Sequence, residues 1–293
     1  MLLRLGLVVA DRIINALPSR VAWAVADLSG DLWRRMAPAR RRLVAANLAR
    51  VCDATGRPAH GPALDALVRR AFRHHARYYV ELLRVPHFRP DALDRIVTFE
   101  PWSEHEEPMR AGGTILVSSH LGNFDPFGSY LASHGFKATV PVEEIRPREL
   151  FEFLTARRGG GRVTMVPLRA SRRPLVEALR RGEVVGIVGD RDLSGQGVEV
   201  DLFGHPTRVP SGPAALAVLT GAPIVAGRCL RIGPDRFVAG GVRITWSPSG
   251  KRDADIEALT RKLAARYEHD IGEAPEQWWG AFQPRWPDLR PSA

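Results

Sequence analysis

The stretch Thr114-Ile-Leu-Val-Ser-Ser-His-Leu-Gly-Asn-Phe-Asp125 carries the pattern that decides the fold. Residues 114–119 form a short apolar run of the kind found in buried strands. Residues 124–133 have the pattern of a helix, so residues 120–123 form a tight turn between strand and helix. This order predicts that His120 lies at the carboxyl end of a strand, where open α/β sheets bind their ligands.

The same alternation of strands and helices continues downstream. Strands separated by helices form a largely parallel or mixed sheet covered on both faces. The sequence therefore predicts an α/β fold with a central, mostly parallel or mixed β-sheet flanked by helices. The predicted strands are residues 114–119, 162–167, 184–188, 223–228 and 237–246, and the predicted helices are residues 124–133, 173–181, 213–220 and 253–267.

The N-terminal part of the chain has a helical pattern instead. Apolar residues recur at spacings of three and four at Leu2, Leu5, Val9, Ile13 and Leu17. No stretch approaches the roughly 20 apolar residues that a membrane-spanning helix needs, so an amphipathic helix is expected. We expect residues 1–95 to be a helical segment that packs on an α/β core formed by residues 96–293, both within one continuous domain.

The chain is strongly basic, with a formal net charge of +10 and a pI of about 10.6. A positive surface favours anionic partners, namely nucleic acid, phospholipid headgroups or a phosphorylated cofactor. The basic clusters at 34–42 and 69–77 are not interleaved with stacking aromatic residues, and no recognition motif is present. We therefore expect no nucleic-acid partner.

No metal site is expected. Cys52 and Cys229 lie far apart and outside any CxxC pattern, which excludes a zinc ribbon or a disulfide framework and fits a reducing, cytoplasmic setting. Asp190-x-Asp192-x-Ser194, with Asp201 at the twelfth position, imitates a calcium-binding loop. The bidentate glutamate is absent, however, and a strand precedes the loop where an EF-hand has a helix.

His120 is the candidate catalytic residue. An imidazole is a suitable general base for a hydroxyl near neutral pH. Asp125, in the first turn of the following helix, has two interpretations: it orients the imidazole, or it simply caps the helix. Gly122 permits a close approach of backbone and substrate, and backbone N–H groups near it are one possible source of donors for an oxyanion.

The sequence around these residues resembles that of the glycerolipid acyltransferase superfamily, whose signature is His-x-x-x-x-Asp. It is most similar to the branch of lipid A acyltransferases and actinobacterial phosphatidylinositol mannoside acyltransferases, and closest to the mannoside enzymes. Further matching blocks follow in the expected order at residues 189–193, 197–206, 210–217, 220–225, 275–279 and 285–286. The resemblance covers residues 110–286 strongly and the N-terminal helices loosely.

The resemblance implies roles for further residues. It makes Glu199 the partner of His120 in a dyad, although Glu199 also fits a solvated strand position. Asp125 then becomes mainly architectural, paired with an arginine such as Arg157 or Arg158. The resemblance also implies a phosphate-bearing acyl donor. The residues expected to contact that donor are Arg158, His205 and Arg228, and the alternative for all three is an ordinary surface position.

The activity implied by the resemblance is O-acyl transfer without a covalent enzyme intermediate. A palmitoyl-like chain would move from acyl-CoA (palmitoyl-CoA), a co-substrate and not a permanently bound cofactor, to a mannose hydroxyl of an anionic phosphatidylinositol mannoside. The alternatives are a lysophospholipid or lipid A-like acceptor, and a thioesterase. The N-terminal helices and their basic clusters would hold the enzyme at the inner membrane surface, as a peripheral protein on the cytoplasmic face.

Overall fold

The computed structural model describes residues 2–100, 109–156, 158 and 162–289. A seven-stranded sheet forms its centre, in the order β1-β9-β8-β2-β5-β3-β4. Neighbouring strands are parallel except β8 and β9, which are antiparallel. The expected α/β class is therefore confirmed. The strands are β1 Val97–Phe99, β2 Thr114–Ser118, β3 Ala138–Val142, β4 Val163–Pro167, β5 Val184–Val188, β8 Ile224–Gly233 and β9 Arg236–Ile244.

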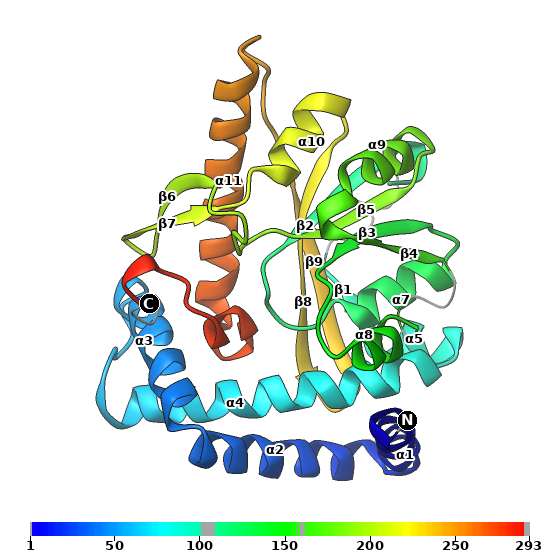
Figure 1. Ribbon diagram of the computed structural model, residues 1–293, viewed down its shortest axis with the longest axis vertical. Coiled ribbons are helices and arrows are strands. Elements are labelled where there is room, and N and C mark those ends of the chain that lie inside the picture. The colour runs from blue at the N-terminus through cyan, green and yellow to red at the C-terminus, as the bar shows by residue number, and fades with distance from the viewer. Residues whose placement is uncertain (1, 101–108, 157, 159–161, 290–293) are drawn as a thin grey trace.

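Strand β2 is buried along its whole length and divides the protein interior into two cores. Ile115 and Val117 face the larger core, and Leu116 faces the smaller one, as the two-residue period of a strand requires. Figure 1 shows helices on both sides of the sheet. The larger core is covered by α9 Arg172–Arg180, α10 Gly212–Thr220 and α11 Arg252–Glu273, and the smaller one by α5 Pro90–Ile96 and α7 Asp125–Ser133.

Among the described residues, four long helices precede α5 and the first strand, as expected for the N-terminal part of the chain. They are α1 Leu2–Ala16, α2 Ser19–Met36, α3 Pro38–Ala54 and α4 Gly61–Arg84, with the short 3₁₀ turn η1 Val85–His87 before α5. Helices α2 and α4 lie side by side in Figure 1. None of the described helices is long and apolar enough to cross a membrane. The division at residue 95 stays a prediction.

Ion pairs join α2 to α4. Asp31 accepts bidentate hydrogen bonds from Arg69 and from Arg73, and Asp27 accepts them from Arg77. The two guanidinium groups hold the pKa of Asp31 well below its ordinary value. The basic cluster at 69–77 is therefore largely used to fasten two helices together, which the sequence pattern did not reveal.

Four elements were not predicted, and the three-residue strand β1 is one of them. Strand β3 contains Pro141 and is only half-buried, and helix α8 Arg148–Thr155 is short. A separate hairpin consists of β6 Val198–Leu202 and β7 His205–Val209. Alternation along 198–203 indicated only the first of its strands. The other predicted strands and helices are confirmed, with β8 and α11 longer than expected.

The C-terminal segment consists of three short 3₁₀ turns packed into the larger core, η4 Pro275–Gln277, η5 Trp279–Phe282 and η6 Pro287–Leu289. Trp278 and Trp286 are completely buried. The side-chain amide of Asn47 in α3 donates to the carbonyl groups of Ala281 and Gln283, at 2.7 and 2.9 Å. Trp278 is thus a core residue.

Candidate functional site

His120 and an unpredicted carboxylate, Asp190, meet at the carboxyl ends of two neighbouring strands. β2 and β5 pair in parallel with Ser118 opposite Val188, and the amide of Gly189 donates to the carbonyl of Ser118 at 2.7 Å. His120 lies two residues beyond the end of β2, and Asp190 lies two residues beyond the end of β5. The parallel register therefore brings together two side chains that are 70 residues apart in the sequence.

The contact between them is direct. The Nδ1 atom of His120 forms a short hydrogen bond with Oδ1 of Asp190, and the same oxygen accepts the backbone N–H of His120 at 3.1 Å. The indole N–H of Trp278 donates to Oδ2 at 3.1 Å. The Asp190 side chain is only 1% exposed, so these donors fix its orientation.

Asp190 remains ionised despite its burial. Burial raises the pKa of Asp190, but His120, the charge of Arg285 and the Trp278 hydrogen bond outweigh it, so the pKa lies well below its ordinary value. An ionised carboxylate on Nδ1 keeps the proton on that nitrogen and leaves Nε2 free to accept one. The imidazole is 18% exposed, and its edge meets the Trp279 ring with centroids 4.3 Å apart. The arrangement is that of a general base with a fixed tautomer.

The turn that carries His120 is held by its own backbone. The amide of Leu121 donates to Ser119, that of Gly122 to Gln277, and that of Asn123 to Cys229, at 2.7, 3.0 and 2.8 Å. Since the amide of His120 is bonded to Asp190, residues 120–123 offer no free backbone N–H. The backbone N–H groups of these four residues are therefore not available to bind an oxyanion in this arrangement.

Gly122 is required by a backbone contact, and its role toward substrate stays a prediction. Its φ is +66°, and a Cβ at this position would lie 2.0 Å from the carbonyl oxygen of Cys229 in β8. The side-chain amide of Asn123 donates to Glu81 at 2.8 Å, and Glu81 is paired with Arg231 at 2.7 Å in the buried interior. The loop is thus fixed to α4, to β8 and to the C-terminal segment.

Asp125 does not contact His120. Its carboxylate forms an ion pair with Nε of Arg158 at 3.1 Å. Nη2 of Arg158 donates a hydrogen bond to the Tyr78 hydroxyl at 2.8 Å. This contact agrees with the architectural interpretation of Asp125. Arg157, the other arginine expected as a partner of Asp125, lies outside the described residues. The carboxylate of Asp125 raises the pKa of Arg158, and burial raises that of Tyr78.

Glu199 also lies away from His120. It faces Arg208 across the β6–β7 hairpin and forms an ion pair with it, and its side chain is 72% exposed. The predicted His120–Glu199 contact is therefore corrected: the carboxylate on the imidazole is Asp190. The sequence did hold a signal for Asp190, because it follows a buried strand at the same distance as His120 does. That stretch was interpreted only as a family block and as an imitation of a calcium loop.

The loop after β5 is not arranged to hold calcium. Asp190 faces His120, and the carboxylate of Asp192 accepts hydrogen bonds from the backbone amides of Ser194 and Gly197, at 2.9 and 2.8 Å, and from the Ser194 hydroxyl. Both aspartates therefore direct their oxygens to partners within the protein.

The three residues expected to bind the donor are separated in the structure. Arg158 is engaged by Asp125 and Tyr78, as described above. His205 begins β7, and its carbonyl accepts the indole N–H of Trp286 at 3.2 Å. Arg228 in β8 pairs with Glu100 at 3.3 Å and also with Asp270 and Glu273 of α11.

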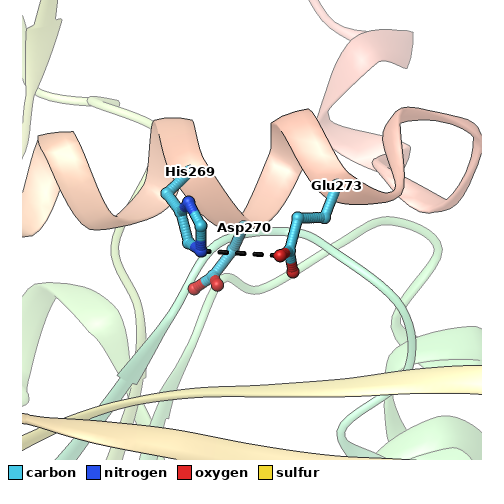
Figure 2. A group of neighbouring side chains, drawn as sticks. All are labelled: His269, Asp270 and Glu273. Carbon is cyan, nitrogen blue, oxygen red and sulfur yellow. Dashed lines mark ion pairs between the residues drawn. The ribbon is translucent and has the colours of Figure 1, made fainter.

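His269, Asp270 and Glu273, shown in Figure 2, have donor atoms close enough together to hold a cation. Asp270 is, however, paired with Arg266 in the adjacent turn, and Arg228 approaches both carboxylates. These guanidinium groups already supply positive charge to both acids. The group therefore fits an ion-pair network between β8 and α11 better than a metal centre.

The chain matches the model of the bacterial lipid A biosynthesis acyltransferase family over residues 3–287. It is 34% identical over 252 residues to the phosphatidylinositol mannoside acyltransferase of Mycobacterium tuberculosis (strain CDC 1551 / Oshkosh), covering 82% of this chain and 75% of that protein. It is 32% identical over 292 residues to the enzyme of the same name from Mycolicibacterium smegmatis, covering 96% and 90%. By this match over most of its length, the chain belongs to the bacterial lipid A biosynthesis acyltransferase family and is an acyltransferase.

Proposed function

We propose that this acyltransferase moves a long, palmitoyl-like fatty acyl chain from acyl-CoA to a mannose hydroxyl of a phosphatidylinositol mannoside. The observation that carries the chemistry is the His120–Asp190 pair, in which one imidazole nitrogen is fixed and the other is left for substrate. The names of the mycobacterial relatives support the acceptor. The donor is inferred from the resemblance to the wider superfamily.

The proposed reaction follows from the geometry of His120. Nε2 accepts the proton of the mannose hydroxyl while that oxygen attacks the thioester carbon, and Asp190 stabilises the resulting imidazolium. As the tetrahedral intermediate collapses, the carbon–sulfur bond breaks and the imidazolium returns its proton to the leaving thiolate. The products are an ester and free coenzyme A, and no group of the protein is acylated.

The other residues expected at the site have different roles in the proposed reaction. Asp125 positions Arg158, and the binding of the donor by Arg158, His205 and Arg228 stays a prediction. Glu199 has no contact with His120 through which it could act as the partner of the base, since its carboxylate is held by Arg208.

The same proposal places the enzyme on the cytoplasmic face of the membrane through α1 and α2. Large apolar side chains are exposed at helical spacing on α2, including Leu28 at 70% and Met36 at 74%. Exposed arginines at positions 35, 41 and 42 lie next to this surface in the chain. The 69–77 cluster contributes less than the sequence suggested, because Arg69, Arg73 and Arg77 are paired with acids of α2.

An acceptor panel tests the reaction. Purified protein is given palmitoyl-CoA with a phosphatidylinositol mannoside, with a lysophospholipid, with a lipid A-like sugar or with water alone, and the products are separated. We expect acylated mannoside as the main product and loss of turnover in His120→Ala with the fold intact. Faster release of free palmitate than of any ester would make the protein a thioesterase, and wild-type turnover by His120→Ala would exclude the mechanism.

Vesicle flotation tests the membrane contact independently of turnover. Leu28→Asp combined with Met36→Asp should reduce binding to vesicles that contain anionic phospholipid. Leu219→Asp is the matched control, because Leu219 is 47% exposed on α10 and lies outside the proposed surface. Equal flotation of all three proteins would contradict the assignment of this surface.

A further inference from the structure

A large cavity lies where the β6–β7 hairpin, the loop that follows Asp190 and the C-terminal segment meet. Its volume is about 980 Å³, enough for a ligand of nucleotide size. Arg191, His205, Arg208 and Arg285 contribute to its walls. Four arginines and one histidine line it in all, so its chemistry is that of an anion site unless its acids neutralise these cations.

Arg285 is the unusual member of this wall. The residue is only 6% exposed, yet its Nε and Nη2 atoms have no hydrogen-bond partner in the described part of the chain. Burial lowers the pKa of Arg285, and the charges of Asp190 and Asp192 oppose that shift. A buried guanidinium with unsatisfied hydrogen-bond donors lowers the stability of a folded protein unless a ligand accepts those hydrogen bonds.

The acids of the cavity do not supply that partner. Glu199 is paired with Arg208, and Asp288 is paired with Arg50, so these two acids cancel two of the four arginines. Asp192 is the third acid, and its oxygens accept three hydrogen bonds from the loop around it. Arg191 makes one long contact, 3.5 Å to Glu143, which is not part of the cavity wall. Four arginines against three acids leave the wall with a net positive charge, and Arg285 and Arg191 are the two arginines that form no ion pair with an acid of the cavity.

We propose that this cavity binds a phosphate group of a small-molecule ligand, with Arg285 as the buried anchor and Arg191 as the second cation. A guanidinium presents several N–H donors in one plane and matches phosphate oxygens geometrically. His205, also in the wall, can add a hydrogen bond. Neither Arg285 nor Arg191 was among the three donor-binding residues expected from the sequence.

The cavity is also connected to the catalytic pair. The Arg285 guanidinium carbon lies 6.0 Å from the centre of the Trp278 ring, and the Trp278 indole donates to Asp190. If the proposed acyl transfer holds, two phosphate carriers reach this region: the nucleotide end of coenzyme A and the phosphoinositol headgroup of the acceptor. A phosphate at Arg285 would hold either of them in the region that Trp278 joins to Asp190.

Direct binding measurements test the site without relying on turnover. Isothermal titration of the full chain uses three probes: adenosine 3′,5′-bisphosphate for the coenzyme A nucleotide, myo-inositol 1-phosphate for the headgroup, and inorganic phosphate. The probe that binds most tightly identifies the source, and equal binding of all three indicates a site for phosphate alone. Absence of binding by every probe at millimolar concentration would overturn the proposal.

The variants assign the binding to the cavity. Arg285→Met and Arg191→Gln should each weaken the best probe by about tenfold or more, since a hydrogen bond to a charged group is commonly worth that much. Arg261→Gln is the control, because Arg261 is exposed on α11 and pairs with Glu257 away from the cavity. Arg191 is accessible, so its variant decides the question if Arg285→Met does not fold.

Unchanged affinity in both cavity variants would refute the site even if the wild-type protein binds phosphate. Binding that survives in a protein without acyl transfer would reject the proposed function and keep the cavity. Normal acyl transfer with no phosphate binding would reject the phosphate site and keep the proposed function.

Discussion

Replacing Asp190 with asparagine keeps the size of the side chain but removes its negative charge. Three N–H donors converge on this carboxylate, two on Oδ1 and one on Oδ2. An asparagine has one acceptor oxygen, so its amide group must face either Trp278 or His120. When the amide group faces His120, Nδ1 of the imidazole has to accept a hydrogen bond. The imidazole proton then moves to Nε2, and Nε2 can no longer accept a proton from substrate.

The size of the effect follows from the charge and the contact. Two unit charges about 4 Å apart at an effective dielectric constant of about 20 attract by about 4 kcal/mol. Losing that stabilisation of the imidazolium lowers kcat by about 10³-fold, and the wrong tautomer extends the loss towards about 10⁴-fold. The KM values should change little, because Asp190 is buried behind the imidazole.

The assay is the initial rate of acyl transfer by Asp190→Asn at saturating substrates, with thermal melting to confirm folding. Glu199→Gln is the matched control and should stay within about twofold of wild type, since exposed ion pairs contribute little. A folded Asp190→Asn protein that keeps more than a tenth of the activity would refute the reasoning. A large loss in Glu199→Gln would restore Glu199 as the functional partner.

Gly122→Ala should lower both the melting temperature and kcat, because its Cβ would clash with the backbone of Cys229. Gly182→Ala is the control: its φ is +78° and the space around its Cβ is open, so it should lower the free energy of unfolding by only about 1–2 kcal/mol, the cost of a left-handed residue. Equal losses in the two variants would exclude the backbone clash. Burial, aided by nearby arginine charges, lowers the pKa of His75 to about 4, so the unfolded chain binds more protons as the pH falls below about 6.5. Stability is then lost on acidification, and His75→Phe should remove about 2 kcal/mol of that loss between pH 6.5 and 5 in urea unfolding; parallel pH profiles would contradict this. Glu81→Gln should lower the free energy of unfolding by about 3–5 kcal/mol, because Arg231 stays buried without its charge partner, and a loss below 1 kcal/mol would show that the pair is dispensable.

Local patterns predicted most of the sheet and its covering helices. The apolar runs around Ile115 and Val185 mark strands without reference to the rest of the chain, because each strand is buried on both faces. Strand β3 was missed since its half-buried residues and Pro141 weaken that signal. Helical periodicity likewise found the N-terminal helices, but not the aspartates that neutralise their arginines.

The partner of His120 depends on strand order, which the local pattern does not contain. Strands β3 and β4 come between β2 and β5 in the chain, yet β5 lies directly beside β2 in the sheet. Only this neighbour relation brings Asp190 to the imidazole. The position of His120 at a strand end was local information and could be predicted, whereas the choice between Asp125, Asp190 and Glu199 was not.

The C-terminal segment has a consequence for when the enzyme becomes active during its synthesis. Trp278 orients Asp190, the carbonyl of Gln277 holds the Gly122 amide, and Arg285 borders the same region. A nascent chain that has already released β2 and β5 from the ribosome still lacks these three contacts. The site is therefore completed only after Arg285 has emerged from the ribosome, so a shorter nascent chain lacks the fixed His120–Asp190 arrangement and the guanidinium beside it.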